Sequence, residues 1–173
     1  VGVGNAVIGM PLDARGVYAG RFVDLLNPYA LGVGLLTVAM FAMHGAAYLD
    51  LRLHEGPLRR RVRRAAGFAW GAFVLAYAVM TAVTLVWVPT ATANFDRFPW
   101  AWALVALNVL AILNVPRAVR ADRPFQAFAS TTLTIVLLVS LLGLALWPNL
   151  VTASNAPENS LTIYRAASSL GTL

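Results

Sequence analysis

The stretch Asn27 to Leu51, NPYALGVGLLTVAMFAMHGAAYLDL, decides the fold class of this chain because it carries no formal charge until Asp50 near its end. It makes up nearly all of an apolar block that runs from about Leu26 to Leu51. A helix rises about 1.5 Å per residue, so a block of this length crosses a hydrocarbon core about 30 Å thick. The stretch therefore predicts a membrane-spanning helix.

Three further apolar blocks follow the first one along the chain. The third block contains Asn108, Asn114 and Pro116, and we expect Pro116 to kink or end its helix because proline has no backbone N–H. The sequence predicts an all-α membrane protein with four transmembrane helices, and the family resemblance given below implies that they belong to a fragment of a larger helical bundle subunit. The predicted spans are 26–51, 65–88, 99–119 and 125–147.

Composition supports a bilayer as the solvent of this chain. Hydrophobic residues make up 60% of the 173 residues and charged residues only 12%, which lies far from the usual composition of soluble domains. The chain has no cysteine, so a disulfide framework, a thiolate metal site and a cysteine nucleophile are excluded. No glycine-rich phosphate loop or catalytic triad pattern is present. We therefore expect no catalytic residue in this chain.

Arginine supplies all thirteen basic residues, and these gather between the apolar blocks. Positive charge is enriched on the cytoplasmic side of membrane proteins, so the stretches after the first and third blocks are predicted to be cytoplasmic. The net charge of +6 thus indicates topology, and we expect no nucleic-acid partner. The predicted cytoplasmic set has nine members, Arg52, Arg59, Arg60, Arg61, Arg63, Arg64, Arg117, Arg120 and Arg123, against four elsewhere, Arg15, Arg21, Arg97 and Arg165.

His44 is the ionisable side chain that lies well inside a predicted span, which makes it a candidate for function. It could ligate a haem, relay protons or contact a quinone. The interpretation that we favour is a neutral imidazole that is hydrogen-bonded to a neighbouring helix. The second histidine, His54, lies about 15 Å further along a continuing helix, so the pair cannot ligate one metal. A b-type haem usually takes two strong axial ligands, so we expect this chain to bind no haem or metal of its own.

Three other kinds of polar residue are candidates for contacts. Asn108 lies near the middle of the third span, where it could bond across helices or line a polar path. Asp50 lies where the first span ends, close enough to Arg52 for a surface pair, and both proton entry and interface solvation remain open for it. A basic run beside a span is attracted to anionic lipid headgroups. The predicted headgroup contacts are Arg59, Arg60, Arg61, Arg63 and Arg64.

Four short stretches resemble subunit II of cytochrome bd-type quinol oxidases, including the cyanide-insensitive branch. The first comprises LLNPY at 25–29, the apolar run that follows it, and HGA at 44–46. The others are GNAVIGMPLD at 4–13, PNLV at 148–151 and SLTIYRAASSLGTL at 160–173. They occur in the family's order over essentially the whole chain, which makes the resemblance specific.

The resemblance implies a subunit with further helices on both sides of this chain. Residues 1–8 would be the tail of a preceding helix, 148–167 an extracytoplasmic loop and 168–173 the start of a final helix. The family's haems b and d and its quinol-oxidising loop belong to subunit I, so this chain is expected to be the haem-free partner. Its expected location is the bacterial inner (plasma) membrane, where it would be multi-pass and surrounded by lipid.

The activity that the resemblance implies is a complex that oxidises quinol and reduces dioxygen to water. Within it, this chain would support and shield subunit I and would meet quinol through the complex. Two other functions remain open at this point. Four spans with a kinked third helix and a midplane Asn108 would also suit half of a secondary transporter. A structural membrane protein without chemistry is the other alternative.

Overall fold

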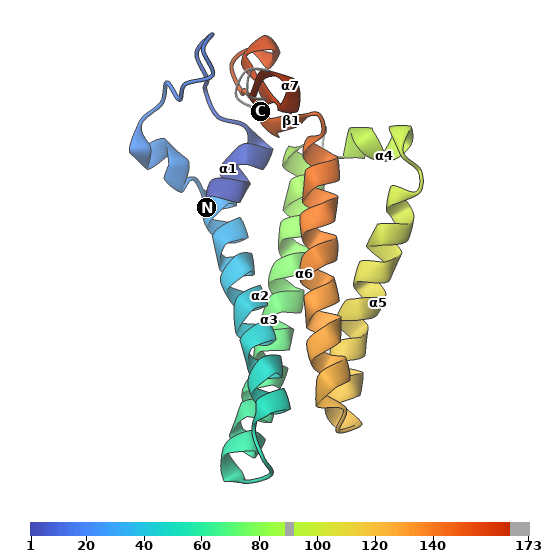
Figure 1. Cartoon of the computed structure of the whole chain (residues 1–173). Helices are drawn as coiled ribbons and strands as arrows, with labels where there is room; N and C mark the ends of the chain where they lie inside the picture. The colour runs from blue at the N-terminus through green and yellow to red at the C-terminus, as the bar shows by residue number, and fades with distance from the viewer. Residues whose placement is uncertain (89–91, 167–173) are drawn as a thin grey trace, which may run out of the picture.

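The computed structural model describes residues 1–88 and 92–166 of the chain. Four long helices lie side by side in a bundle (Figure 1). Each of them is long and apolar enough to cross a membrane. The predicted all-α membrane fold is therefore confirmed. The four helices are α2 (Pro28–Arg52), α3 (Pro57–Trp87), α5 (Ala101–Arg120) and α6 (Pro124–Leu146).

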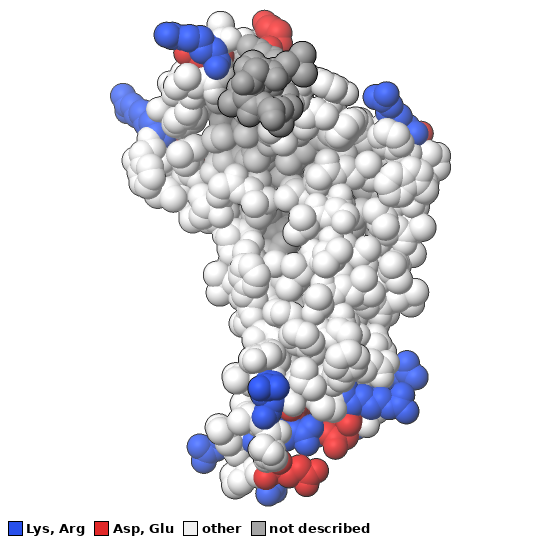
Figure 2. Space-filling model, viewed as in Figure 1, with Lys and Arg blue, Asp and Glu red and all other residues white. Residues whose placement is uncertain are grey.

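Charged side chains gather at the two ends of the bundle and leave a broad uncharged band between them on the face that Figure 2 shows. One end carries the α2–α3 and α5–α6 turns and is called the arginine end here. The opposite end is called the terminal end, because it carries the first and last described segments (Figure 1). The short elements of the terminal end that precede α6 are α1 (Gly2–Ile8), the 3-10 helix η1 (Phe22–Leu26) and α4 (Ala93–Arg97).

Prolines set where three of the long helices begin. Pro28, Pro57 and Pro124 each occupy the first turn, where a missing N–H costs nothing. Asn27 caps α2, because its side-chain oxygen accepts a hydrogen bond of 2.8 Å from the Ala30 amide. Its side-chain nitrogen donates to Asn5 Oδ1 at 2.8 Å, which ties α1 to the start of α2.

The second span was predicted to begin at residue 65, but α3 begins at Pro57. The arginine run therefore lies on the first two turns of this helix and not in a loop. Pro57 starts the helix directly after Gly56, and arginine is a good helix former, so helical backbone continues beyond the apolar stretch. Hydropathy predicts only the apolar part of this helix, which suits the hydrocarbon of the membrane.

The sequence predicts that Pro116 kinks or ends the third helix. Pro116 does not end it, because α5 continues to Arg120. Proline cannot donate to the carbonyl four residues earlier, which is that of Ile112. The indole Nε1 of Trp70, on α3, donates to this oxygen at 2.9 Å. A neighbouring helix thus satisfies the carbonyl that proline leaves free, as in other membrane helices.

Helix packing forms two hairpins, α2 with α3 and α5 with α6, and α6 also packs on α2. The centre of the bundle is an apolar cluster of Met43 from α2, Phe73 from α3 and Ile112 from α5. Leu138 of α6 packs against the same cluster. All four long helices therefore contribute to one core, although most of their apolar surface faces outward.

The segment after α6 folds onto the terminal end of the bundle. The sequence predicts an extracytoplasmic loop over 148–167, and the described part of this segment contains short strands and helical turns. Antiparallel pairing of its two short strands satisfies backbone N–H and C=O groups of this segment. Hydropathy does not predict such pairing. The Asn155 and Asn159 amides each donate to the carbonyl of Leu12 at 2.9 Å, which fixes this segment to the N-terminal stretch. The predicted helix start at 168–173 lies outside the described residues. The elements are the antiparallel strands β1 (Asn149–Val151) and β2 (Leu161–Thr162), η3 (Pro157–Asn159) and α7 (Ile163–Ala166).

Candidate functional site

His44 of α2 contacts two residues of α6. Its Nδ1 lies 2.9 Å from the Thr131 hydroxyl, and its ring stacks on Phe128 with centroids 4.9 Å apart. Thr131 donates its own proton to the Phe128 carbonyl at 2.8 Å, so it is an acceptor toward His44. The imidazole Nδ1–H therefore donates to Thr131. This contact joins α2 and α6 inside the bundle.

Asn108 of α5 is fully buried and contacts α3. Its side-chain nitrogen donates to the Tyr77 hydroxyl at 3.3 Å. Its side-chain oxygen has no hydrogen-bond partner among the described residues. An amide that donates to a neighbouring helix holds the two helices together. The Asn108 side-chain oxygen is a polar atom in an otherwise apolar core.

Asp50 was expected to form a surface pair with Arg52, and the structure corrects both the partner and the setting. The Asp50 side chain is only 2% exposed, and Arg59 Nε donates to its Oδ1 at 2.9 Å. The first turn of α3 folds back against the last turn of α2 and brings Arg59 over the carboxylate. A buried charge requires a close partner of opposite sign, and Arg59 supplies it.

Arg59 also joins the two helical hairpins. Arg59 Nη2 donates to Asp122 Oδ1 at 3.0 Å, and Arg63 Nη1 donates to the same oxygen at 2.8 Å. Asp122 lies in the α5–α6 turn with a φ of 51°, a left-handed conformation that Asp tolerates better than most residues. Arg63 bonds the Val119 carbonyl as well. Asp50, Arg59, Asp122 and Arg63 are called the ion network below.

The ion network divides the arginine run into two sets. Arg59 and Arg63 are four residues apart on one face of α3, so both reach the α5–α6 turn. Arg60, Arg61 and Arg64 are exposed on the remaining faces. Asp122 was not predicted as a partner of these arginines. The spacing of Arg59 and Arg63 was the available signal, but it does not reveal which acid they meet.

The described residues contain no group of three or more His, Cys, Asp or Glu side chains that could hold a metal ion. The structure does not bring the sequence candidates together, because His44, Asn108 and the ion network each bridge a different pair of elements. These polar side chains therefore form separate links between helices.

The whole chain, residues 1–173, matches the family described as cytochrome bd terminal oxidase subunit II. It is 30% identical over 207 residues to cytochrome bd-I ubiquinol oxidase subunit 2 of Escherichia coli K12, covering 100% of this chain and 53% of that relative. It is 29% identical over 203 residues to a probable cytochrome oxidase subunit 2 of Haemophilus influenzae, with the same coverage. The chain spans about half the length of these curated relatives.

Proposed function

Because the chain belongs to the family of cytochrome bd terminal oxidase subunit II, we propose that it works as a membrane subunit of a quinol oxidase. The match over the whole chain carries this proposal, and the Escherichia coli relative is named a ubiquinol oxidase subunit. The complex oxidises two quinols to two quinones and reduces one dioxygen to two waters. Family membership favours this activity over half of a secondary transporter or a structural protein without chemistry.

Within the complex, the chain supports and shields the haem-bearing subunit I, and the haems b and d and the quinol site belong to that partner. The long helices support this role because large apolar side chains on them face outward. Phe68 on α3 is 80% exposed and Leu35 on α2 is 66% exposed. Such surfaces suit a partner helix or lipid. No residue of the chain is assigned a catalytic role.

The inner bacterial membrane is the location that this function requires, with the arginine end in the cytoplasm. The exposed Arg60, Arg61 and Arg64 then lie where anionic lipid headgroups are found, while Arg59 and Arg63 are held by the ion network. Direct lipid contact is therefore proposed mainly for these three exposed arginines. The other two contribute to the positive potential of the same turns.

Purification of the complex with this chain tests the proposed function. A tag on this chain should bring down a larger membrane subunit together with haem bands of the b and d types. Quinol-dependent oxygen consumption should accompany them. A colourless preparation without a larger partner would contradict the proposal and would favour half of a secondary transporter or a structural membrane protein instead.

His44 is proposed to pack helices and not to ligate a haem, because its hydrogen bond to Thr131 and its stacking on Phe128 join α2 to α6 inside the bundle. His44→Ala in the assembled oxidase should keep every haem band and lower yield or stability slightly. Loss of one interhelical hydrogen bond in a bundle costs about 1 kcal/mol. Thr131→Val should show the same small loss, since it removes the same bond from the other side. Disappearance of one haem band while both subunits still assemble would show that His44 is a ligand.

A further inference from the structure

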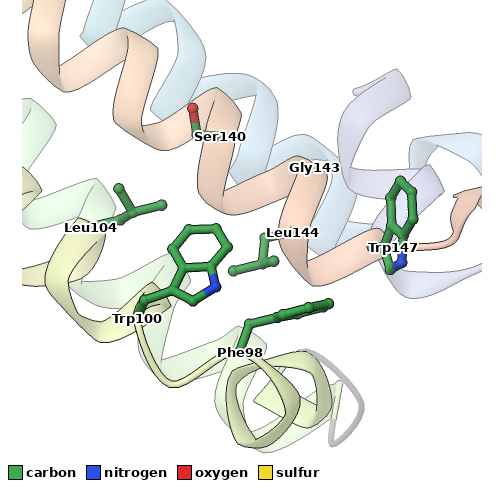
Figure 3. Close-up of a pocket in the computed structure, with 7 residues that line it drawn as sticks. All are labelled: Phe98, Trp100, Leu104, Ser140, Gly143, Leu144 and Trp147. Carbon is green, nitrogen blue, oxygen red and sulfur yellow. The ribbon is translucent and has the colours of Figure 1, made fainter.

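A groove of about 320 Å³ lies between α5 and α6 near the terminal end of the bundle (Figure 3). Phe98, Trp100 and Leu104 form one side of it, at and just before the start of α5. The end of α6 forms the other side. In Figure 3 the Trp100 and Phe98 rings face Leu144, while Trp147 lies further along at the end of α6. The two tryptophans are 58% and 41% exposed.

The groove offers a ligand little hydrogen bonding at its floor. The one hydroxyl in the lining, that of Ser140, donates to the Val136 carbonyl of its own helix at 2.9 Å. The carbonyls at the end of α6 are also engaged, since Asn94 Nδ2 donates to Leu144 at 2.8 Å and to Trp147 at 2.6 Å. A ligand with a polar headgroup deep in this groove would lose hydrogen bonds to water without replacement. The floor of the groove therefore suits an apolar ligand and disfavours a polar one.

The mouth of the groove has the chemistry of a membrane surface. Tryptophan is enriched at the level of lipid headgroups, where its apolar ring and its N–H meet different surroundings. Arg97 directly precedes Phe98, and its guanidinium lies 5.5 Å from the centre of that ring. The Arg97 side chain is exposed, so its charge is available beside the groove to a phosphate at headgroup level.

We propose that this groove binds one acyl chain of an anionic phospholipid, with the phosphate held near Arg97. Hydrocarbon fills the apolar floor between α5 and α6, the tryptophan rings border the ester region, and the arginine supplies the complementary charge. The site lies at the opposite end of the bundle from the ion network. Lipid binding there is not a step of the proposed quinol oxidase reaction, although its test uses the assembled complex.

Gly143 provides a direct test because it lines the groove and has no side chain. A Cβ built on Gly143 meets nothing within 4 Å, so a side chain at this position has room to begin, and Gly143→Leu is expected to occupy the groove. Gly71 on α3 has the same free space, and Gly71→Leu is the matched control. Ser140→Phe fills the other end of the groove from an exposed position and serves if Gly143→Leu does not assemble.

The experiment uses the complete oxidase complex in nanodiscs that contain phosphatidylglycerol with a diazirine on its acyl chain. After illumination, mass spectrometry should find label within 98–104 and 140–147 of the wild type. Gly143→Leu should abolish most of this label, and Gly71→Leu should retain it. Arg97→Gln should reduce the preference for phosphatidylglycerol over phosphatidylcholine about fivefold, as expected for one arginine near a membrane surface.

Three results would overturn the proposal. The first is absence of label from both segments in the wild type. The second is equal labelling in the Gly143→Leu or Ser140→Phe variant. The third is labelling of the groove by a photoreactive quinone, or crosslinking of the groove to another subunit, in place of the lipid probe. Retained haem bands in each variant show that assembly is intact, so loss of label then reports on the groove itself.

Discussion

At the scale of the residue, Asp50 has the most demanding environment among the charged side chains of the ion network. It is 2% exposed, and Arg59 donates to one of its oxygens, while the other oxygen has no partner among the described residues. Asp50→Asn removes the charge and leaves Arg59 partly buried with a weaker partner. Removing one member of a buried pair is strongly destabilising, so we expect a clear fall in the melting temperature of the purified complex.

Glu55→Gln is the control for this variant. Glu55 also approaches Arg59, at 3.9 Å, but its side chain is 88% exposed. Exposed ion pairs contribute little, so the control should melt close to the wild type. Equal melting temperatures for the Asp50 and Glu55 variants would mean that the ion network adds no stability. A selective loss of oxygen consumption by Asp50→Asn at unchanged stability would point to proton entry instead.

At the scale of the element, the continuity of α5 depends on a neighbouring helix. Trp70→Phe removes the donor to the Ile112 carbonyl, which Pro116 cannot bond. A buried carbonyl without a partner is unfavourable, so we expect a loss of about 1 kcal/mol in stability. In a Pro116→Ala background the new N–H reaches the Ile112 carbonyl, and the same Trp70 substitution should cost less.

A double-mutant cycle measures this coupling by denaturant unfolding of the complex. Trp87→Phe is the matched control, because Trp87 lies on the same helix and is 57% exposed. It should leave stability nearly unchanged. If Trp70→Phe costs the same with and without Pro116, the indole hydrogen bond is not what allows α5 to continue.

The first turns of α3 give a second prediction at this scale. Replacing the exposed Arg60 and Arg64 by Gln should weaken binding of anionic lipid to the arginine end, because each arginine near such a surface contributes about 1 kcal/mol. Native mass spectrometry of the complex with phosphatidylglycerol would measure this. Arg63→Gln should affect lipid binding less and stability more, since Arg63 is held by Asp122. The reverse pattern would contradict the division of the run into two sets.

At the scale of the whole molecule, the distribution of arginine predicts the orientation of the bundle. Gly56 lies in the α2–α3 turn and Ala93 begins α4 at the other end. With the arginine end in the cytoplasm, Gly56→Cys should react with an impermeant maleimide only after the membrane is opened. Ala93→Cys should react in intact cells. These 173 residues contain no cysteine, so label found on them reports on the introduced position. Reversed accessibility would invert the orientation and the proposed lipid contacts with it.

Much about this protein could be predicted from the sequence, because a bilayer imposes its requirements on local stretches of chain. Length and lack of charge identified the four helices, and the order of short motifs identified the family, which the match over the whole chain confirms. Asn27 and Pro28 likewise mark the start of α2 by local chemistry. Each of these inferences depends on residues close together in the sequence, where composition and spacing carry the information.

Only the tertiary structure decided which polar groups meet. Trp70 bonds a carbonyl 42 residues away, and His44 bonds Thr131 at a separation of 87 residues. Hydropathy along the chain determines which segments cross the membrane, but it does not determine how two helices are rotated relative to each other. That rotation, fixed by side-chain packing, placed Arg59 over Asp50 and Trp70 beside the turn of α5 that contains Pro116.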